Sequence, residues 1–88
     1  EWWNDEELKA LSARVVRAVP NDLGANDMRA LVLCGRCGAW QVGPRSAAEL
    51  KEAATHYDRV AALHPAPAAK PDLVGKAAWC RHQAVAMS

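Results

Sequence analysis

The sequence predicts an all-α fold of about four helices. Apolar residues recur three and four positions apart through most of its 88 residues, as they do on one face of an amphipathic helix. Two of these apolar stripes end at a proline, Pro20 and Pro65, and one begins at a capping box formed by Ser46 and Glu49. No segment shows the strict apolar and polar alternation of a half-buried strand.

The first helix is expected to follow Asn4 and to end before Pro20. The Asn4 side chain can accept a hydrogen bond from a first-turn N–H group, which is the usual role of asparagine before a helix. Apolar residues then follow at helical spacing, and they are Leu8, Leu11, Val15, Val16 and Val19.

The second helix is expected to start near Asn26 or Asp27 and to run to about Trp40. It would then contain Gly35 and Gly38, each of which costs roughly 1 kcal/mol relative to alanine inside a helix. Close approach of a neighbouring helix would compensate for this cost. Leu31 is expected to be buried against the third helix.

The third helix is expected to run from Ser46 to His64, and the fourth from Pro71 onward. The third has the capping box and buries a stripe that includes Tyr57. Pro71 suits the first turn of a helix, and Asp72 suits the positive end of the helix dipole. The residues of the fourth helix that share a face are Leu73, Ala77, Cys80, Ala84 and Met87.

The second and third predicted helices together resemble the tetratricopeptide repeat (TPR) family. In the first helix of this pair, the family pattern W-x2-L-G-x2-Y is matched by Leu31-x2-Cys34-Gly35-x2-Gly38. In the second helix, the positions of the family's A, F and P are taken by Ala53, Tyr57 and Pro65. The resemblance implies antiparallel helical hairpins, as a segment of a right-handed α-solenoid or as a small four-helix array.

The chain departs from the family in its period. Pro20 and Pro65 lie 45 residues apart, against a family repeat of about 34 residues. An insertion is expected around residues 42–47, and Gly38 replaces the usual aromatic residue. The interpretation is one divergent TPR-like domain over residues 1–88, expected to be a fragment of a longer protein because it begins at Glu1. A plain four-helix bundle is the alternative.

The composition narrows the classes of function. A formal net charge of +1, from 11 basic and 10 acidic residues, is unlike that of a nucleic-acid-binding domain. No apolar run approaches the ~20 residues needed to cross a membrane. Three cysteines, an odd number, argue against a secreted disulfide framework and favour a reducing intracellular compartment.

The expected function is non-catalytic binding of a protein or peptide. The TPR resemblance implies a concave groove lined by the second and fourth helices, and basic residues there would suit an acidic partner. Arg29, Val32 and Arg36 are three and four residues apart, so on one helix they share a face. The candidate groove residues are therefore Arg29, Val32, Arg36, Lys76 and Arg81.

Two alternatives remain open from the residues. One is a small zinc-binding or redox module that uses Cys34, Cys37, Cys80 and His82, since these supply the ligands of a Cys3His site. The other is a structural segment of a longer solenoid, which binds nothing by itself.

An enzyme is not predicted, and no cofactor is expected. There is no phosphate-binding glycine loop and no paired-carboxylate motif. His56 and His64 are expected to be structural, with His56 facing solvent. A short helical stack also leaves apolar faces uncovered at its ends. The isolated chain is therefore expected to self-associate, unless Trp2, Trp3 and the fourth helix cover those faces.

Overall fold

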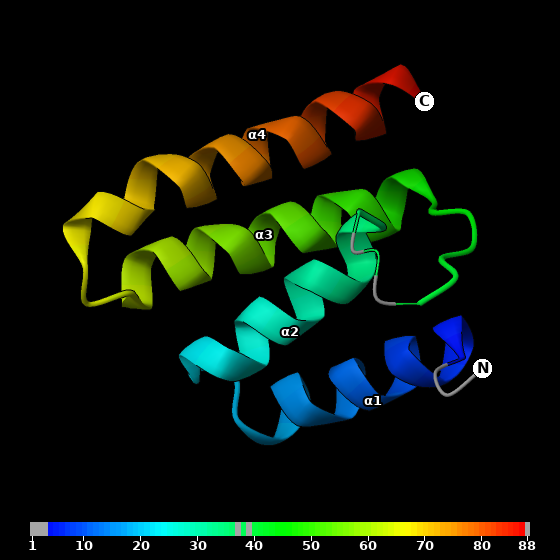
Figure 1. Cartoon of the computed structure of the whole chain (residues 1–88), viewed down its shortest axis with the longest axis horizontal. Coiled ribbons are helices and arrows are strands. Elements are labelled where there is room, and N and C mark those ends of the chain that lie inside the picture. The colour runs from blue at the N-terminus through cyan, green and yellow to red at the C-terminus, as the bar shows by residue number, and fades with distance from the viewer. Residues whose placement is uncertain (1–3, 37, 39, 88) are drawn as a thin grey trace.

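The computed structural model describes residues 4–36, 38 and 40–87, and the described chain is entirely helical where it is regular. The elements are α1 (Asp5–Ala18), α2 (Leu23–Cys34), α3 (Ala47–Leu63), the 3-10 turn η1 (Pro67–Ala69) and α4 (Lys70–Ala86). Consecutive helices run antiparallel, and each packs mainly against the next one along the chain (Figure 1). The prediction of an all-α fold with four helices is confirmed for these residues.

The starts of α1 and α3 follow the capping signals in the sequence. Asn4 Oδ1 accepts hydrogen bonds from the backbone N–H groups of Glu6 at 2.9 Å and Glu7 at 3.2 Å. At α3, Ser46 Oγ accepts from Glu49 N, and Glu49 Oε1 accepts from Ser46 N. Both helices therefore begin where local hydrogen bonding satisfies first-turn donors.

The predicted bounds of the second helix were wrong at both ends. Asp22 caps α2 through a 2.9 Å hydrogen bond from Ala25 N to its Oδ2, so the helix begins earlier than expected. It ends at Cys34 because Gly35 takes the left-handed conformation, with φ 72° and ψ 14°. Glycine enters this region at no steric cost and commonly ends helices there. Gly38, which was expected inside the helix, lies beyond its end, and a Cβ there would meet nothing within 4 Å.

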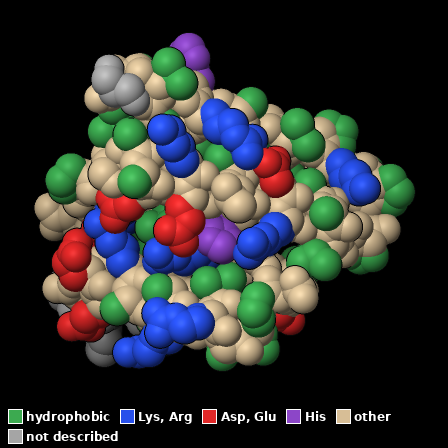
Figure 2. All heavy atoms as spheres, turned by 180° about the vertical axis from the view of Figure 1, so that it is seen from behind, with side chains coloured by type: hydrophobic (Ala, Val, Ile, Leu, Met, Phe, Trp, Pro, Cys, Tyr) green, Lys and Arg blue, Asp and Glu red, His purple; other side chains and the backbone are tan. Residues whose placement is uncertain are grey.

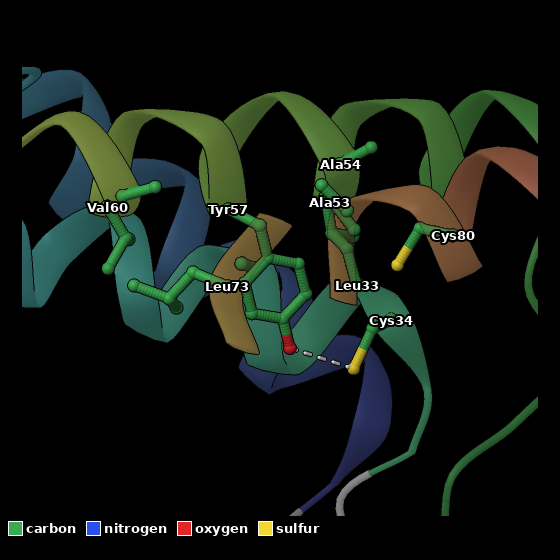
Figure 3. Close-up of a cluster of buried hydrophobic side chains, with 11 residues drawn as sticks. Leu33, Cys34, Ala53, Ala54, Tyr57, Val60, Leu73 and Cys80 are labelled. Atoms are coloured by element: carbon green, nitrogen blue, oxygen red, sulfur yellow. Dashed lines mark hydrogen bonds between the residues drawn. The ribbon is translucent and has the colours of Figure 1, made fainter. Parts of the chain in front are cut away.

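The apolar core lies between α2, α3 and α4. Tyr57 is 4% exposed and lies near the centre of this cluster, as the sequence predicted (Figure 3). Leu31 was expected to be buried but is 37% exposed. Ala30, Leu33 and Cys34 face the core instead, since they are three and four positions apart and Leu31 lies one residue round the helix from Ala30.

A polar network joins α1 to α2 and α3, beside the buried side chain of Leu8. Arg29 Nη1 donates to Lys9 O at 2.8 Å and to Ser12 Oγ at 3.0 Å, while Arg29 Nε donates to Glu52 at 3.0 Å. Lys9 pairs with Glu49 at 2.9 Å. On the face shown in Figure 2, acidic and basic side chains lie side by side around a histidine.

The expectation that His56 faces solvent was wrong. Its ring is only 6% exposed, with Nδ1 2.8 Å from Asn26 Oδ1 and Nε2 3.1 Å from Glu52 Oε2. Asn26 in turn donates from Nδ2 to the carbonyls of Pro20 and Asp22, both at 2.9 Å. His56 is therefore part of the polar contact between α2 and α3.

The segment between α2 and α3 is held against α1 by one buried ion pair. Arg45 donates to both carboxylate oxygens of Asp5, at 2.7 and 2.8 Å, and also to Val32 O at 2.8 Å. Asp5 further accepts from Trp40 Nε1 at 2.7 Å and from Gly43 N at 3.2 Å. Arg45 thus satisfies a carbonyl in the last turn of α2 and fixes the segment between α2 and α3 to the start of α1.

Each helix in the described part of the chain is too short or too polar to span a lipid bilayer.

Candidate functional site

A groove runs between α2 and α4, and residues of α2 line two of its hollows. The larger has a volume of about 270 Å³. Its lining residues come from α2, from the segment after it, from α3 and from α4, and they are Asp27, Leu31, Cys34, Arg36, Tyr57, Lys76, Trp79 and Cys80. We call the two hollows together the α2–α4 groove.

The inner wall of the larger hollow is neutral. Tyr57 OH donates to Cys34 Sγ at 3.5 Å, and Cys80 lies beside this pair (Figure 3). Burial, together with the hydrogen bond to Cys34, raises the pKa of the Tyr57 phenol far above its usual range. Burial and the neighbouring Cys34 likewise raise the pKa of the Cys80 thiol to about 11. At neutral pH both groups keep their protons, so neither supplies the anionic nucleophile that catalysis would need.

The outer rim carries two cations that rest on aromatic rings. The Arg36 guanidinium carbon lies 4.3 Å from the centre of the Trp79 ring, and Lys76 Nζ lies 5.9 Å from the centre of the Tyr57 ring. Lys76 also pairs with Asp72 at 3.3 Å. Both distances are within the range of attraction between a cation and an aromatic face. The rings thus hold positive charge at the mouth of the hollow.

The smaller hollow has a volume of about 210 Å³ and continues the groove toward the start of α2. Its lining residues are Leu23, Asp27, Val60, His64, Ala69, Asp72 and Leu73. The two hollows share Asp27. On α2 the lining positions 23, 27 and 31 are four apart, so they follow one face of that helix. Positions 72, 76 and 79 likewise follow one face of α4, and Ala69 lies just before them in η1.

Two of the five predicted groove residues, Arg36 and Lys76, line the larger hollow. Arg29 does not line either hollow, since its guanidinium is held by α1 and Glu52. Val32 is 4% exposed and belongs to the interior. Arg81 pairs with Asp58 of α3. The shared face of Arg29 and Arg36 does not exist, because α2 ends at Cys34 and Arg36 lies beyond it.

Most of the groove lining was not among the predicted groove candidates, and the missed residues include Asp27, Leu31 and Trp79. Trp79 packs partly buried against the core, beneath Arg36. Its position three residues after Lys76 places both on one face of α4, and that spacing is visible in the sequence.

The cysteine alternative is only partly visible in the structure. Cys34 and Cys80 are buried free thiols on the inner wall of the groove, whereas His82 is exposed. Cys37 lies outside the described residues. Within the described ranges, no group of three or more His, Cys, Asp or Glu side chains is arranged to hold a metal ion. A zinc or redox role that includes Cys37 stays a prediction.

Comparison of the chain with protein-family models, with curated proteins and with solved structures finds no match. The resemblance to TPR proteins therefore rests on the sequence pattern around Ala53, Tyr57 and Pro65, and it stays a prediction.

Proposed function

We propose that this chain is a non-catalytic interaction module that holds a peptide segment of a partner protein in the α2–α4 groove. The observation that carries the proposal is the Arg36 guanidinium, laid over Trp79 at 4.3 Å at the edge of a hollow. An exposed cation fixed on an aromatic surface, next to apolar side chains, suits an anionic residue of a peptide.

The cations at the rim favour an anionic residue of the partner at this position. The aromatic faces that could attract a ligand cation already hold Arg36 and Lys76. Arg36 makes no hydrogen bond or ion pair within the described residues, so the N–H groups at the edge of its guanidinium remain available. A carboxylate can accept two of these in parallel, which is the usual geometry for arginine.

The size of the hollow favours a side chain over a whole small molecule. Pockets for small-molecule ligands are usually about 300–1,000 Å³, and the larger hollow is below that range. Leu31 is 37% exposed on its wall and Trp79 is half-buried, so an apolar side chain would find contact there. This combination supports binding of an extended segment that places one side chain in the hollow.

The test is selection of binders from a displayed library of short random segments, followed by NMR mapping on the folded chain. We expect the selected segments to shift the backbone signals of α2 and α4 and the Trp79 indole. Binding should weaken by about tenfold in Arg36→Glu/Lys76→Glu, and should also weaken as salt rises.

The matched control is Lys51→Glu/Arg59→Glu. It makes the same change in charge at two exposed positions of α3 that line neither hollow. Equal losses in both double variants would show that net charge, not the groove, governs binding. Failure to select any binder from the library would overturn the proposal itself.

A second candidate is a structural segment of a longer solenoid, and the outer face of α4 favours it. Val74 is 53% exposed and Val85 is 70% exposed, and they lie eleven residues apart on one face of the helix. If another helix normally covers this face, the isolated chain should self-associate and Val74→Ser/Val85→Ser should not. Sedimentation velocity distinguishes these states, and a monomeric wild-type chain would remove the support. Trp2 and Trp3, which were expected to help cover the apolar end faces, lie outside the described residues.

A further inference from the structure

The larger hollow of the α2–α4 groove carries opposite charges at its two ends. Arg36 lies where α2 has ended, beside the larger hollow, and Asp27 lies nearer the start of α2, where the two hollows meet. Asp72 lines the smaller hollow from the first turn of α4. The larger hollow is therefore positive at one end, at Arg36, and negative at the other, at Asp27.

Within the part of the chain that the structure describes, these two end charges are unpaired. Neither Asp27 nor Arg36 makes a hydrogen bond or an ion pair among the described residues. By contrast, Lys76 and Asp72 pair with each other, with Lys76 Nζ 3.3 Å from Asp72 Oδ2. A ligand thus meets one free carboxylate and one free guanidinium, with a neutralised pair on the α4 side.

Helix geometry sets the distance between these charges. Asp27 and the end of α2 at Cys34 are seven residues apart, which is about 10 Å along the axis at 1.5 Å per residue. An extended peptide rises about 3.3 Å per residue, so about three residues cover this span. Side chains of a ligand that reach both ends are then about three positions apart.

We propose that the groove takes an extended peptide segment that bears an acidic and a basic side chain about three residues apart. The acidic side chain binds Arg36 and the basic one binds Asp27. This inference rests on the proposed peptide-binding function and specifies its ligand. A uniformly acidic segment is disfavoured, because part of it would lie against Asp27, and such repulsion is a common source of specificity.

Single neutral variants separate the two ends. Selection from the displayed library on the wild-type chain should enrich segments with both charges at this spacing. Asp27→Asn should lose the preference for the basic residue and keep that for the acidic one. Arg36→Gln should do the reverse. Neither side chain supports the fold through a hydrogen bond, so both variants should retain the helical circular dichroism of the wild type.

Synthetic versions of one selected segment give the size of the effect. Replacing either charged residue of the segment by a neutral one should weaken binding by about three- to fivefold, as for exposed charge pairs. The same replacement should have no effect on the chain variant that already lacks the matching charge. Moving the two charges to adjacent positions should weaken binding as much as deleting one of them.

Two failures are distinguishable. If no segment binds the wild-type chain, the proposed function is wrong and this inference is wrong with it. If segments bind and their NMR shifts map to α2 and α4, but they lack the charge pattern or ignore Asp27→Asn, the function stands and this inference is overturned.

Discussion

The junction of α4 with the rest of the molecule is built from small apolar side chains, whereas α1 is attached largely through polar groups. The buried residues of α4 are Leu73, Ala77, Cys80 and Ala84. In α1 only Leu8 and Ser12 are buried, and its remaining contacts use Asp5, Lys9 and the carbonyl of Lys9. The two ends of one small domain thus depend on different forces.

This difference predicts how the α1 junction and the apolar core should each respond to pH, to salt and to the loss of a side chain. Burial of apolar surface is non-directional and insensitive to pH and moderate salt. Ion pairs and charged hydrogen bonds are directional, titrate with pH and weaken when one partner is removed. We therefore expect the core of α2, α3 and α4 to fail through loss of packing, and the attachment of α1 to fail through loss of charge.

The largest effect should come from the apolar side. Tyr57→Ala removes a large, 4% exposed side chain from the centre of the core and should destabilise the chain by about 3–5 kcal/mol. Such a loss is comparable to the whole stability of a small domain. Urea or thermal unfolding measures it, with Leu63→Ala as control, because Leu63 is 41% exposed. A shift of a degree or two in Tm for Tyr57→Ala would contradict the described core.

A smaller and more local effect should follow Arg45→Ala. This change leaves the Asp5 carboxylate, with its side chain 12% exposed, without its cationic partner, and should cost about 3 kcal/mol. Amide hydrogen exchange should accelerate in α1 well before it does in α3, since α1 is held by this contact. Uniform acceleration across the four helices would show that α1 and the core unfold as one unit.

Acid should weaken the polar side selectively. The hydrogen bonds and charge of Arg45 hold the pKa of the Asp5 carboxyl well below its usual range. Burial opposes ionisation of Glu49 and Glu52, but Lys9 and Ser46 at the first, and Arg29 and His56 at the second, outweigh it and lower both pKa values.

A carboxyl with a lowered folded pKa stabilises the fold above its unfolded pKa of about 4, and this contribution is lost as pH falls toward the folded value. Between about pH 6 and pH 3 the free energy of unfolding should therefore fall by roughly 1–2 kcal/mol. Urea unfolding at a series of pH values measures this, and Asp5→Asn should flatten the curve. An identical slope in that variant would exclude Asp5 as a source.

The smallest effect concerns the thiol in the apolar core. Because the pKa of Cys80 is raised to about 11 and its side chain is buried, it should react with a thiol reagent only when the core opens. Counting modified thiols by mass spectrometry at neutral pH tests this. Rapid labelling of Cys80 in the folded chain would show that α4 separates from α3 far more easily than its packing indicates.

Sequence reasoning succeeded where structure is decided locally. Asn4 and the Ser46–Glu49 pair lie within three residues of the groups they cap, so the starts of α1 and α3 could be predicted. The end of α2 could not be predicted, because the residues around a glycine do not show whether it lies inside a helix or ends it. Nothing near Gly35 shows that Arg45, ten residues later, will occupy the adjacent space.

Contacts between distant residues account for most of the remaining differences at the site. His56 is buried where its ring is hydrogen-bonded to Asn26, thirty residues earlier in the chain. No local sequence pattern predicts this pairing. Arg29 was predicted to line the groove from its spacing to Val32 and Arg36 alone. The carbonyl of Lys9 in α1, twenty residues earlier, accepts a hydrogen bond from it and holds it outside the groove. Arg36 lines the groove although the helical face from which it was predicted does not exist, and Lys76 lines it from α4 as expected.

Gly35 limits how this sequence can change over evolution. Its backbone has φ 72°, which side chains with a Cβ rarely adopt, and a Cβ there would lie 3.0 Å from Arg45 Cγ. Any other residue would strain the turn and press on the arginine that joins α2 to α1. A Cβ at Gly38 or Gly75 would meet nothing within 4 Å. Among related sequences, Gly38 and Gly75 can therefore be replaced by other residues. Gly35 should be retained wherever Arg45 is retained.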